Sequence, residues 1–564
     1  MKQYRQSGLF ILIFSWLMAS SVMAQTPQGA GLVPTGENLN AGAVAAEVDQ
    51  QREWIPEQKD VSVQFKTSSP TSEQTDMKVM VQTVTFSGME DNLTEEELQA
   101  VVQAELGKEK SVADLWSMAG KVTDYLHSKG YMAALAILPP QEIRNGQVKM
   151  EILMGHYDRI GFTNQSDLLT ERAVSLTHRI RPGKIIEKDS LDRTLLTLND
   201  IPGLRAQAYL SPGRTNGTAE LLFDLTTTEH NRGYVYTDNY GSRYTGRWRV
   251  GTAWNWNNIS HTGDQLYASY LHSETGGVEN YDIRYEIPVG NDGTVLGIEN
   301  YRTDYVLGRQ YSVYDAYGKS KSWKIFTKTP LIRTLGKSLY FNWALENEQL
   351  TDRIELFGTE SEKHGLAMRY GFDGLWQGDR YATSARLTQT LGRMHMANDY
   401  AKENDYYKTA GKYDKTNVEI YHIQRLNDRW SLHATLEGQY AWKNLDSSEK
   451  MYIGGYGAVR AFPQSEAGGD EGVLGSLEFR YQTGITGLQL AGFYDAGWVR
   501  YEKDPFPGMQ NSRTLAGAGV GFIYTGSGNM YARLDYAYPL SDNYSESKGK
   551  NLHGTWWFQL VMKI

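Results

Sequence analysis

The stretch Arg247–Asn257, RWRVGTAWNWN, alternates between large or β-branched side chains and small or polar ones. The first set shares one face and consists of Trp248, Val250, Thr252, Trp254 and Trp256. A period of two residues is that of a β-strand with one apolar and one polar face. The same pattern recurs in Tyr281–Ile287, Trp430–Tyr440, Val473–Gln482 and Trp556–Ile564. These segments reach about ten residues, the length at which a tilted strand crosses a bilayer.

A sheet in lipid must close into a barrel, because every backbone N–H and C=O group needs a partner there. The alternating region, residues 229–564, divides by roughly 20 residues per strand and connection into about 16 strands, an even number as in bacterial barrels. The last alternating segment reaches the end of the chain, and we expect it to pair with the first. Abundant tyrosine (37) and tryptophan (14) fit the aromatic girdles of such barrels. The alternative is a large soluble β-protein whose apolar faces pack together.

The first residues have the pattern of a secretory signal peptide. Lys2 and Arg5 precede an apolar run, Leu9–Phe14, and the small-residue sequence Val22–Ala24 follows. We therefore expect residues 1–24 to be a signal peptide and the mature chain to be exported. A membrane anchor is the alternative, but the apolar run is short for one.

Composition argues against several function classes. The chain has no cysteine, so neither disulfides nor thiolate zinc sites can form. Its formal net charge of −9 argues against nucleic acid as a partner. Gly318–Ser320 and Gly336–Ser338 resemble the end of a phosphate loop but lack its earlier glycine, so no nucleotide is expected. We find no convincing catalytic, metal or cofactor constellation and expect no enzyme; the alternative is a membrane-barrel hydrolase that uses Ser and His.

Two zones precede the barrel region and an N-terminal segment precedes both. Residues 25–77 contain a predicted helix, Ala43–Trp54, and a Ser/Thr-rich linker, Thr67–Ser72. Residues 78–155 have the order β-α-α-β-β. Their helices are expected to begin at the capping box Thr94-x-x-Glu97 and at Ser111. Their last strands are expected at Ala133–Leu138 and Gln147–Leu153.

Residues 156–228 repeat this order more loosely. The expected strands are Arg159–Thr163, Leu204–Leu210 and Ala219–Leu225, and the expected helices are Asp167–Arg181 and Glu187–Leu198. An Asn-Gly pair, which favours a tight turn, precedes the last strand of both units, at Asn145-Gly146 and Asn216-Gly217. We interpret the two units as tandem copies of one α/β domain. The alternative is a single irregular α/β domain.

A glycine-rich loop lies late in the chain, at Gly454–Pro463, GGYGAVRAFP. In a later strand Leu490 and Tyr494 share the apolar face, so Phe493 and Asp495 are expected to face the barrel lumen. If the loop folds into the lumen, Arg460 can pair with Asp495. A hydrogen-bonded guanidinium–carboxylate pair in that partly dry interior would fix the loop. The alternative is that Arg460 is an ordinary surface-loop arginine.

These motifs resemble those of the two-partner secretion transporters (TpsB type), also known as haemolysin secretion/activation proteins, within the outer-membrane assembly-factor superfamily. Val459-Arg460-Ala461-Phe462 is similar to the family's lumenal-loop motif, Val-Arg-Gly followed by Tyr or Phe. Phe493-x-Asp495-x-Gly497 matches the barrel-wall motif that receives it. Further similarities lie at Asp238–Arg247, Gly263–Leu266 and Tyr285–Gly290. Ala461 departs from the usual glycine, and its Cβ would resist a positive φ.

The resemblance implies an architecture. It implies two periplasmic POTRA domains, residues 78–155 and 156–228, followed by a 16-stranded antiparallel transmembrane β-barrel, residues 229–564. It also implies that the N-terminal helix plugs the resting pore, here with Ala43, Val44, Glu47 and Arg52.

The resemblance also implies a function, namely outer-membrane translocation of a large secreted exoprotein (TpsA type, haemolysin- or adhesin-like) from the periplasm to the cell surface. The POTRA domains would capture the unfolded exoprotein by strand addition, and outer-membrane lipids would surround the barrel. One alternative is an outer-membrane protein assembly factor, an insertase, which typically has more POTRA domains. The other is a passive porin, which needs none.

Overall fold

The computed structural model describes residues 40–41, 43–45, 63–65, 78–90, 93–228, 231–526 and 529–564. The predicted signal peptide, residues 1–24, and the predicted linker Thr67–Ser72 lie outside the described residues. Of the predicted helix Ala43–Trp54, only residues 43–45 are described, and they are helical, as is Ala41. Glu47 and Arg52 therefore lie outside the described residues.

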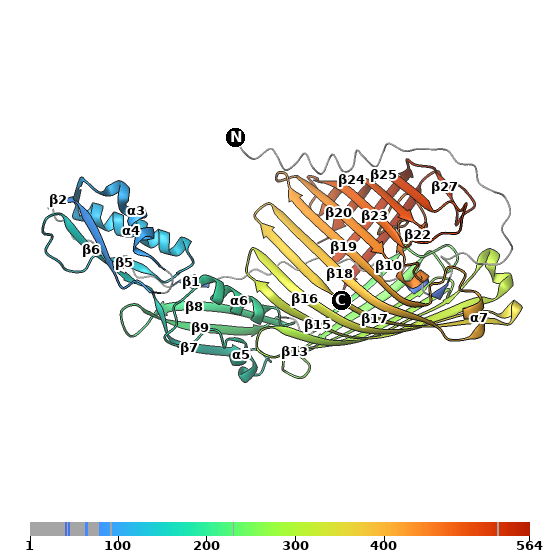
Figure 1. Cartoon of the computed structure of the whole chain (residues 1–564), viewed down its shortest axis with the longest axis horizontal. Coiled ribbons are helices and arrows are strands. Elements are labelled where there is room, and N and C mark those ends of the chain that lie inside the picture. The colour runs from blue at the N-terminus through green and yellow to red at the C-terminus, as the bar shows by residue number, and fades with distance from the viewer. Residues whose placement is uncertain are drawn as a thin grey trace. The chain divides into compact units, whose positions relative to one another are not determined.

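Sixteen antiparallel strands form a closed barrel, which confirms the predicted fold (Figure 1). Most neighbours in the barrel are also consecutive in sequence, because short connections link each strand to the next. The strands are β10 (Asn231–Asp238), β11 (Arg249–Asn257), β12 (Gln265–Ser273), β13 (Val278–Val289), β14 (Thr294–Val306), β15 (Ala316–Arg333), β16 (Lys337–Ile354), β17 (Thr359–Gly378), β18 (Tyr381–Met396), β19 (Gly411–Arg425), β20 (Trp430–Ala441), β23 (Glu471–Gln482), β24 (Leu488–Arg500), β25 (Ser512–Thr525), β26 (Met530–Pro539) and β29 (Thr555–Lys563).

The barrel closes where its first strand meets its last. β10 and β29 pair antiparallel from Tyr234 opposite Lys563 to Asp238 opposite Gln559. Beyond the paired residues, the Asn239 side chain continues the seam, because its amide donates to the carbonyl of Trp556 (3.0 Å) and its oxygen accepts from the Phe558 amide (2.8 Å). No sheet edge is left open at this junction.

The two faces of the barrel strands differ in chemistry. On the outer face, Val250, Val520 and Trp556 are 57%, 58% and 56% exposed. On the inner face, charged residues such as Asp282 and Asp535 are almost fully buried. An apolar outer face and a polar inner face are what a barrel in lipid requires.

The first α/β domain follows the predicted β-α-α-β-β order and adds one strand pair to it. Its sheet has the order β3-β6-β5, with β3 parallel to β6 and β5 antiparallel to it. Both helices begin where predicted, since Thr94 accepts a hydrogen bond from the Glu97 amide (3.4 Å) and Ser111 forms a reciprocal capping box with Asp114. The elements are β2 (Lys78–Val81), β3 (Thr83–Ser87), α3 (Glu95–Val102), β4 (Lys108–Ser111), α4 (Val112–Ser128), β5 (Leu135–Ile137) and β6 (Gln147–Leu153).

The second α/β domain has a sheet of order β1-β8-β9-β7. Its edge strand β1 (Val63–Phe65) belongs to the N-terminal segment, where a helix and a linker but no strand were expected, and pairs parallel with β8 from Ala208 to Leu210. Among the described residues, no helix is long and apolar enough to cross a membrane. The remaining elements are β7 (His156–Gln165), α5 (Thr170–Leu176), α6 (Lys188–Asn199), β8 (Leu204–Pro212) and β9 (Thr218–Thr227).

Two arginines bond the second α/β domain to the end of β15. Arg333 binds the carboxylate of Asp200 with two hydrogen bonds of 2.9 and 2.8 Å. Arg193 of α6 donates to the carbonyl of Pro330 at 3.0 Å. Paired guanidinium–carboxylate bonds of this kind fix orientation as well as distance.

We expect Val520→Arg to reduce the amount of folded protein in the membrane, because an arginine on the lipid face near the bilayer centre costs about 2–4 kcal/mol. Thr435→Arg is the control, since Thr435 shares the inner face of β20 with the buried Gln439. Heat-modifiable mobility of the membrane fraction in SDS gels measures folded barrel. Equal amounts of folded protein for both variants would contradict an apolar outer face.

Candidate functional site

The connection between β20 and β23, residues 442–470, is buried inside the barrel along most of its length. We call it the lumenal loop. It contains a 3₁₀ turn at Ser447–Glu449 and a small antiparallel pair, β21 (Met451–Tyr452) with β22 (Gly468–Gly469). The polar groups of a buried connection need hydrogen-bond partners within the protein. The polar contacts of the lumenal loop therefore determine where it lies.

Arg460 lies at the tip of the lumenal loop and is only 6% exposed. Its Nε and Nη2 donate to the two oxygens of Asp495, each at 2.8 Å, and its backbone N–H also donates to Asp495 (3.2 Å). Nη1 donates to Glu478 at 2.7 Å and to Asp535 at 3.3 Å. The alternative of an exposed surface-loop arginine is therefore wrong.

The charges around Arg460 are balanced. Arg533 donates to Glu478 (2.6 Å) and to Asp535 (3.0 Å), and Arg480 donates to Glu478 (2.6 Å). Three guanidinium groups thus share the three carboxylates of Glu478, Asp495 and Asp535. A buried ion must have such partners, because removing one partner leaves an uncompensated charge that typically costs about 3–5 kcal/mol.

The other predicted residues of the two motifs surround this charge cluster. Val459, Ala461 and Phe462 are fully buried in an apolar cluster that also contains Leu515. The guanidinium of Arg460 lies 3.4 Å from the ring centroid of Phe493, a cation–π contact. A Cβ at Gly497 would lie 3.0 Å from the Cβ of Ile453, so the loop packs closely against this point of β24.

Ala461 occupies a position where a positive φ was expected to matter, but it is not among the described non-glycine residues with positive φ. Its Cβ instead fills the space above Gly517 of β25. A Cβ at Gly517 would meet the Cβ of Ala461 at 2.4 Å, which no real pair of carbon atoms tolerates. The alanine in the loop is therefore accommodated by a glycine in the wall.

The loop tip also binds the last strand, a contact that was not predicted from the sequence. Trp557 donates from Nε1 to the carbonyl of Arg460 (2.6 Å), and Thr555 donates to the carbonyl of Ala461 (3.1 Å). Trp557 is the one aromatic residue on the inner face of β29, which it shares with Thr555, Gln559, Val561 and Lys563, and this was the available signal. Stacking of Tyr456 on Tyr240, with ring centroids 3.7 Å apart, adds a contact between the loop and the connection after β10.

The N-terminal segment also lies against interior residues. Ala43 and Val44, two of the predicted plug residues, are 0% and 3% exposed. The carbonyl of Ala45 accepts a hydrogen bond of 3.5 Å from the hydroxyl of Tyr301 on β14.

Among the described residues, no group of histidine and carboxylate side chains could hold a metal ion.

We expect Gly517→Ala to displace the loop tip, because overpacking of a closed interior costs about 1–3 kcal/mol. The second change Ala461→Gly should restore the loop, since it removes the atom that clashes. Protease sensitivity of the lumenal loop in intact outer membranes measures the displacement. Equal sensitivity of the single and double variants would contradict the proposed complementarity.

Comparison with known proteins gives the site its context. Residues 217–524 match the family model described as haemolysin secretion/activation protein ShlB/FhaC/HecB. Residues 79–155 match the model of the ShlB-type POTRA domain.

Among individual proteins, the heme/hemopexin transporter protein HuxB of Haemophilus influenzae (strain 86-028NP) is 29% identical over 459 residues, covering 79% of this chain and 81% of HuxB. The structure of CdiB from Escherichia coli has a TM-score of 0.70 at 17% identity and covers 88% of this chain and 93% of its own. CdiB from Acinetobacter baumannii has a TM-score of 0.63 at 17% identity, with coverage of 90% and 95%.

The two structures share the fold of this chain. The secretion/activation model covers more than half of the chain, including both motifs that meet at Arg460. The chain therefore belongs to the haemolysin secretion/activation protein family.

Proposed function

We propose that this outer-membrane transporter takes one large exoprotein of the TpsA type, unfolded, from the periplasm and passes it through the barrel to the cell surface. The family match supports secretion of a partner protein over the insertase alternative. The observation that carries the proposal is the buried Arg460 cluster, since it fixes a polar loop inside a closed barrel.

Capture of the exoprotein begins, in this proposal, at a sheet edge of the POTRA domains. In the first domain, β5 pairs with β6 and with no other described strand. An extended segment of the exoprotein can add to such an edge through backbone hydrogen bonds, which demand no single side-chain sequence. Bonds such as Arg333 with Asp200 keep the second domain close to the barrel.

The barrel interior offers a polar route for an extended chain. Its walls carry charges of both signs close together, for example Arg284 with Glu286 at 2.9 Å. Paired charges and bridging water can satisfy backbone groups of a passing chain without holding one sequence tightly. Folding of the exoprotein outside the cell would then make transport irreversible.

The outer face of the barrel supports outer-membrane lipids as the second class of partner. Large apolar side chains are exposed there on strands around the ring: Val250, Ile283, Trp323, Val418, Val520 and Trp556. Aromatic side chains among them suit the bilayer interface.

Arg460→Ala should leave the barrel inserted and reduce secretion of the exoprotein at least about tenfold. The variant removes the guanidinium that binds Asp495, whereas Glu478 and Asp535 keep Arg533, and the loss of about 3–5 kcal/mol releases the loop tip. The measurement is the amount of exoprotein in the culture medium when both proteins are produced together.

Arg353→Ala is the matched control, because the Arg353 side chain is only half-buried and its ion pairs with Glu355 and Glu360 contribute little. Arg460→Lys tests geometry, since lysine keeps the charge but cannot bind Asp495 with two nitrogens. Normal secretion by Arg460→Ala, with normal insertion, would exclude a role for the loop tip in transport.

Deletion of residues 43–54 should raise the single-channel conductance in planar lipid bilayers, if the N-terminal helix plugs the resting pore. Residues 43–45 occupy lumenal space, as the burial of Ala43 and Val44 indicates. Unchanged conductance after the deletion would show that these residues do not obstruct the pore.

A further inference from the structure

A second set of charges holds the lumenal loop, on the arm that leads from β20 toward the tip. Glu449 is its centre and is 4% exposed. Its carboxylate accepts from Arg369 of β17 (2.9 Å) and from the hydroxyl of Tyr413 (2.7 Å), and Lys415 of β19 lies 2.8 Å from it. None of these partners belongs to the Arg460 cluster, so the two sets are separate anchors.

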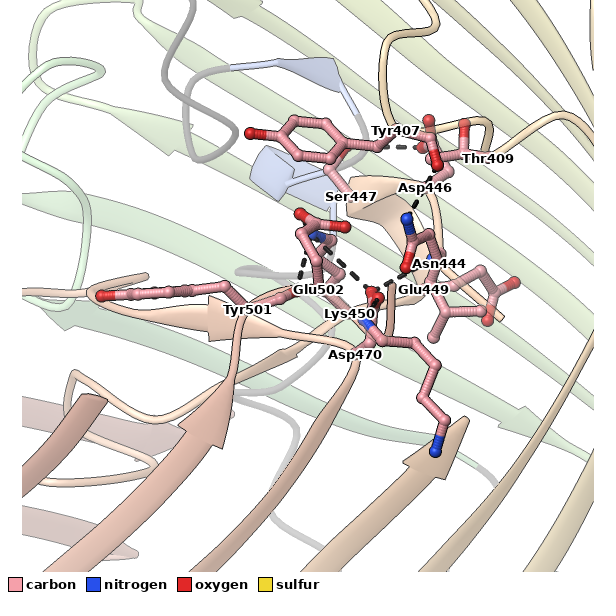
Figure 2. A network of polar contacts seen from close by, with 12 residues as sticks. Tyr407, Thr409, Asn444, Asp446, Ser447, Glu449, Lys450, Asp470, Tyr501 and Glu502 are labelled. Atoms are coloured by element: carbon pink, nitrogen blue, oxygen red, sulfur yellow. Dashed lines mark hydrogen bonds and ion pairs between the residues drawn. The ribbon is translucent and has the colours of Figure 1, made fainter. Parts of the chain in front are cut away.

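Two further charged residues of the arm, Asp446 and Lys450, have partners elsewhere in the barrel, and those of Lys450 are drawn in Figure 2. Asp446 accepts from Lys363 of β17 at 2.7 Å. Lys450 forms an ion pair with Glu502 and donates to the carbonyl of Tyr501 at 3.0 Å. Residues 446–450 are therefore bound to three different parts of the barrel and its connections.

The same arm binds the N-terminal segment through Ser447, which lies between Asp446 and Glu449. The Ser447 hydroxyl donates to the side-chain oxygen of Asn40 at 2.7 Å. That oxygen also accepts from the backbone N–H of Ala43 at 2.9 Å, so Ser447 binds the group that begins the helical turn.

The barrel wall supplies another polar contact to this segment, besides the bond from Tyr301 to Ala45. Asp352 of β16 accepts from the backbone N–H of Ala41 at 2.7 Å, and the same oxygen accepts from the hydroxyl of Tyr305, also at 2.7 Å. Tyr305 thus holds the carboxylate in the position in which it meets Ala41.

Apolar side chains complete the surroundings of the segment. Ala41 and Val44 pack in one cluster with side chains from several barrel strands, namely Tyr305, Leu350, Met394, Tyr413 and Ala441. Tyr413 is also a partner of Glu449, so the apolar contact and the second anchor share a residue. In an otherwise polar interior, such a cluster requires an apolar occupant to exclude water from it.

We infer that Asp352, Ser447 and this apolar cluster form a binding site for the chain's own residues 40–45, and that Glu449 and Asp446 hold in place the loop arm that completes it. The inference deepens the proposed plug function and rests on it. It assigns different tasks to the two anchors: the Arg460 anchor fixes the loop tip, whereas the Glu449 anchor keeps the pore closed. Release of the arm frees the N-terminal segment while the tip stays bound.

Single-channel recording of the full-length chain in planar bilayers tests this assignment. Glu449→Gln and Asp352→Ala should each raise the open probability about tenfold, which corresponds to about 1.4 kcal/mol. Glu360→Gln is the matched control, because Glu360 is a half-buried carboxylate that pairs with Arg353 and belongs to neither anchor. Heat-modifiable mobility verifies that each variant is folded.

The outcomes separate the binding site from the plug. If deletion of residues 43–54 raises conductance but neither Glu449→Gln nor Asp352→Ala changes the open probability, the inferred site is wrong and the plug stands. If the deletion itself has no effect, both are wrong. An increase for both point variants and none for Glu360→Gln supports the inference.

A cross-link provides a second test, because the natural chain contains no cysteine. The paired changes Asn40→Cys and Ser447→Cys place two thiols where the side chains now share a hydrogen bond. When oxidised, this variant should secrete at least about tenfold less exoprotein, and a reductant should restore secretion. Each single-cysteine variant is a control. Unchanged secretion by fully cross-linked protein would overturn the inference that the segment must leave Ser447.

Discussion

A single buried cation, Arg460, sets a constraint on the whole barrel wall around it. Its carboxylate partners come from three strands, Glu478 on β23, Asp495 on β24 and Asp535 on β26. A slip of one residue in any of these strands would turn its carboxylate toward lipid. The register of the wall and the position of the loop therefore stabilise each other, and the contact of Trp557 with the loop tip extends this dependence to the strand that closes the barrel.

Local alternation was enough to predict a barrel of about 16 strands and to place several of them, because a wall between lipid and polar interior imposes a period of two on every segment. It also sufficed to place Phe493 and Asp495 on the inner face. The partners Glu478, Asp535 and Trp557 were not predicted, since they meet Arg460 through the relative register of distant strands, which no local pattern records. Strand β1 was missed for a related reason: three residues in a polar segment become a strand only because β8 offers an unpaired edge.

The lumenal loop and the N-terminal segment show how a polar interior can hold two different kinds of element. The loop is held by compensated charges, which are strong but geometrically demanding. The segment is held by small apolar side chains and a few hydrogen bonds, some of them to its backbone groups. Replacing these hydrogen bonds by bonds to water costs less free energy than breaking the buried ion pairs of the loop. This difference in chemistry agrees with a permanent role for the loop tip and a transient one for residues 40–45.

Because β1 is paired with β8, the N-terminal segment is tethered to the second α/β domain by a connection of fixed length. Only residues 46–62 separate the buried helical turn from the strand that is paired with β8. Seventeen residues span at most about 60 Å when fully extended. While β1 remains paired with β8, residues 40–45 can therefore move no farther than about 60 Å from β1. A displaced segment would stay close enough to the barrel to return.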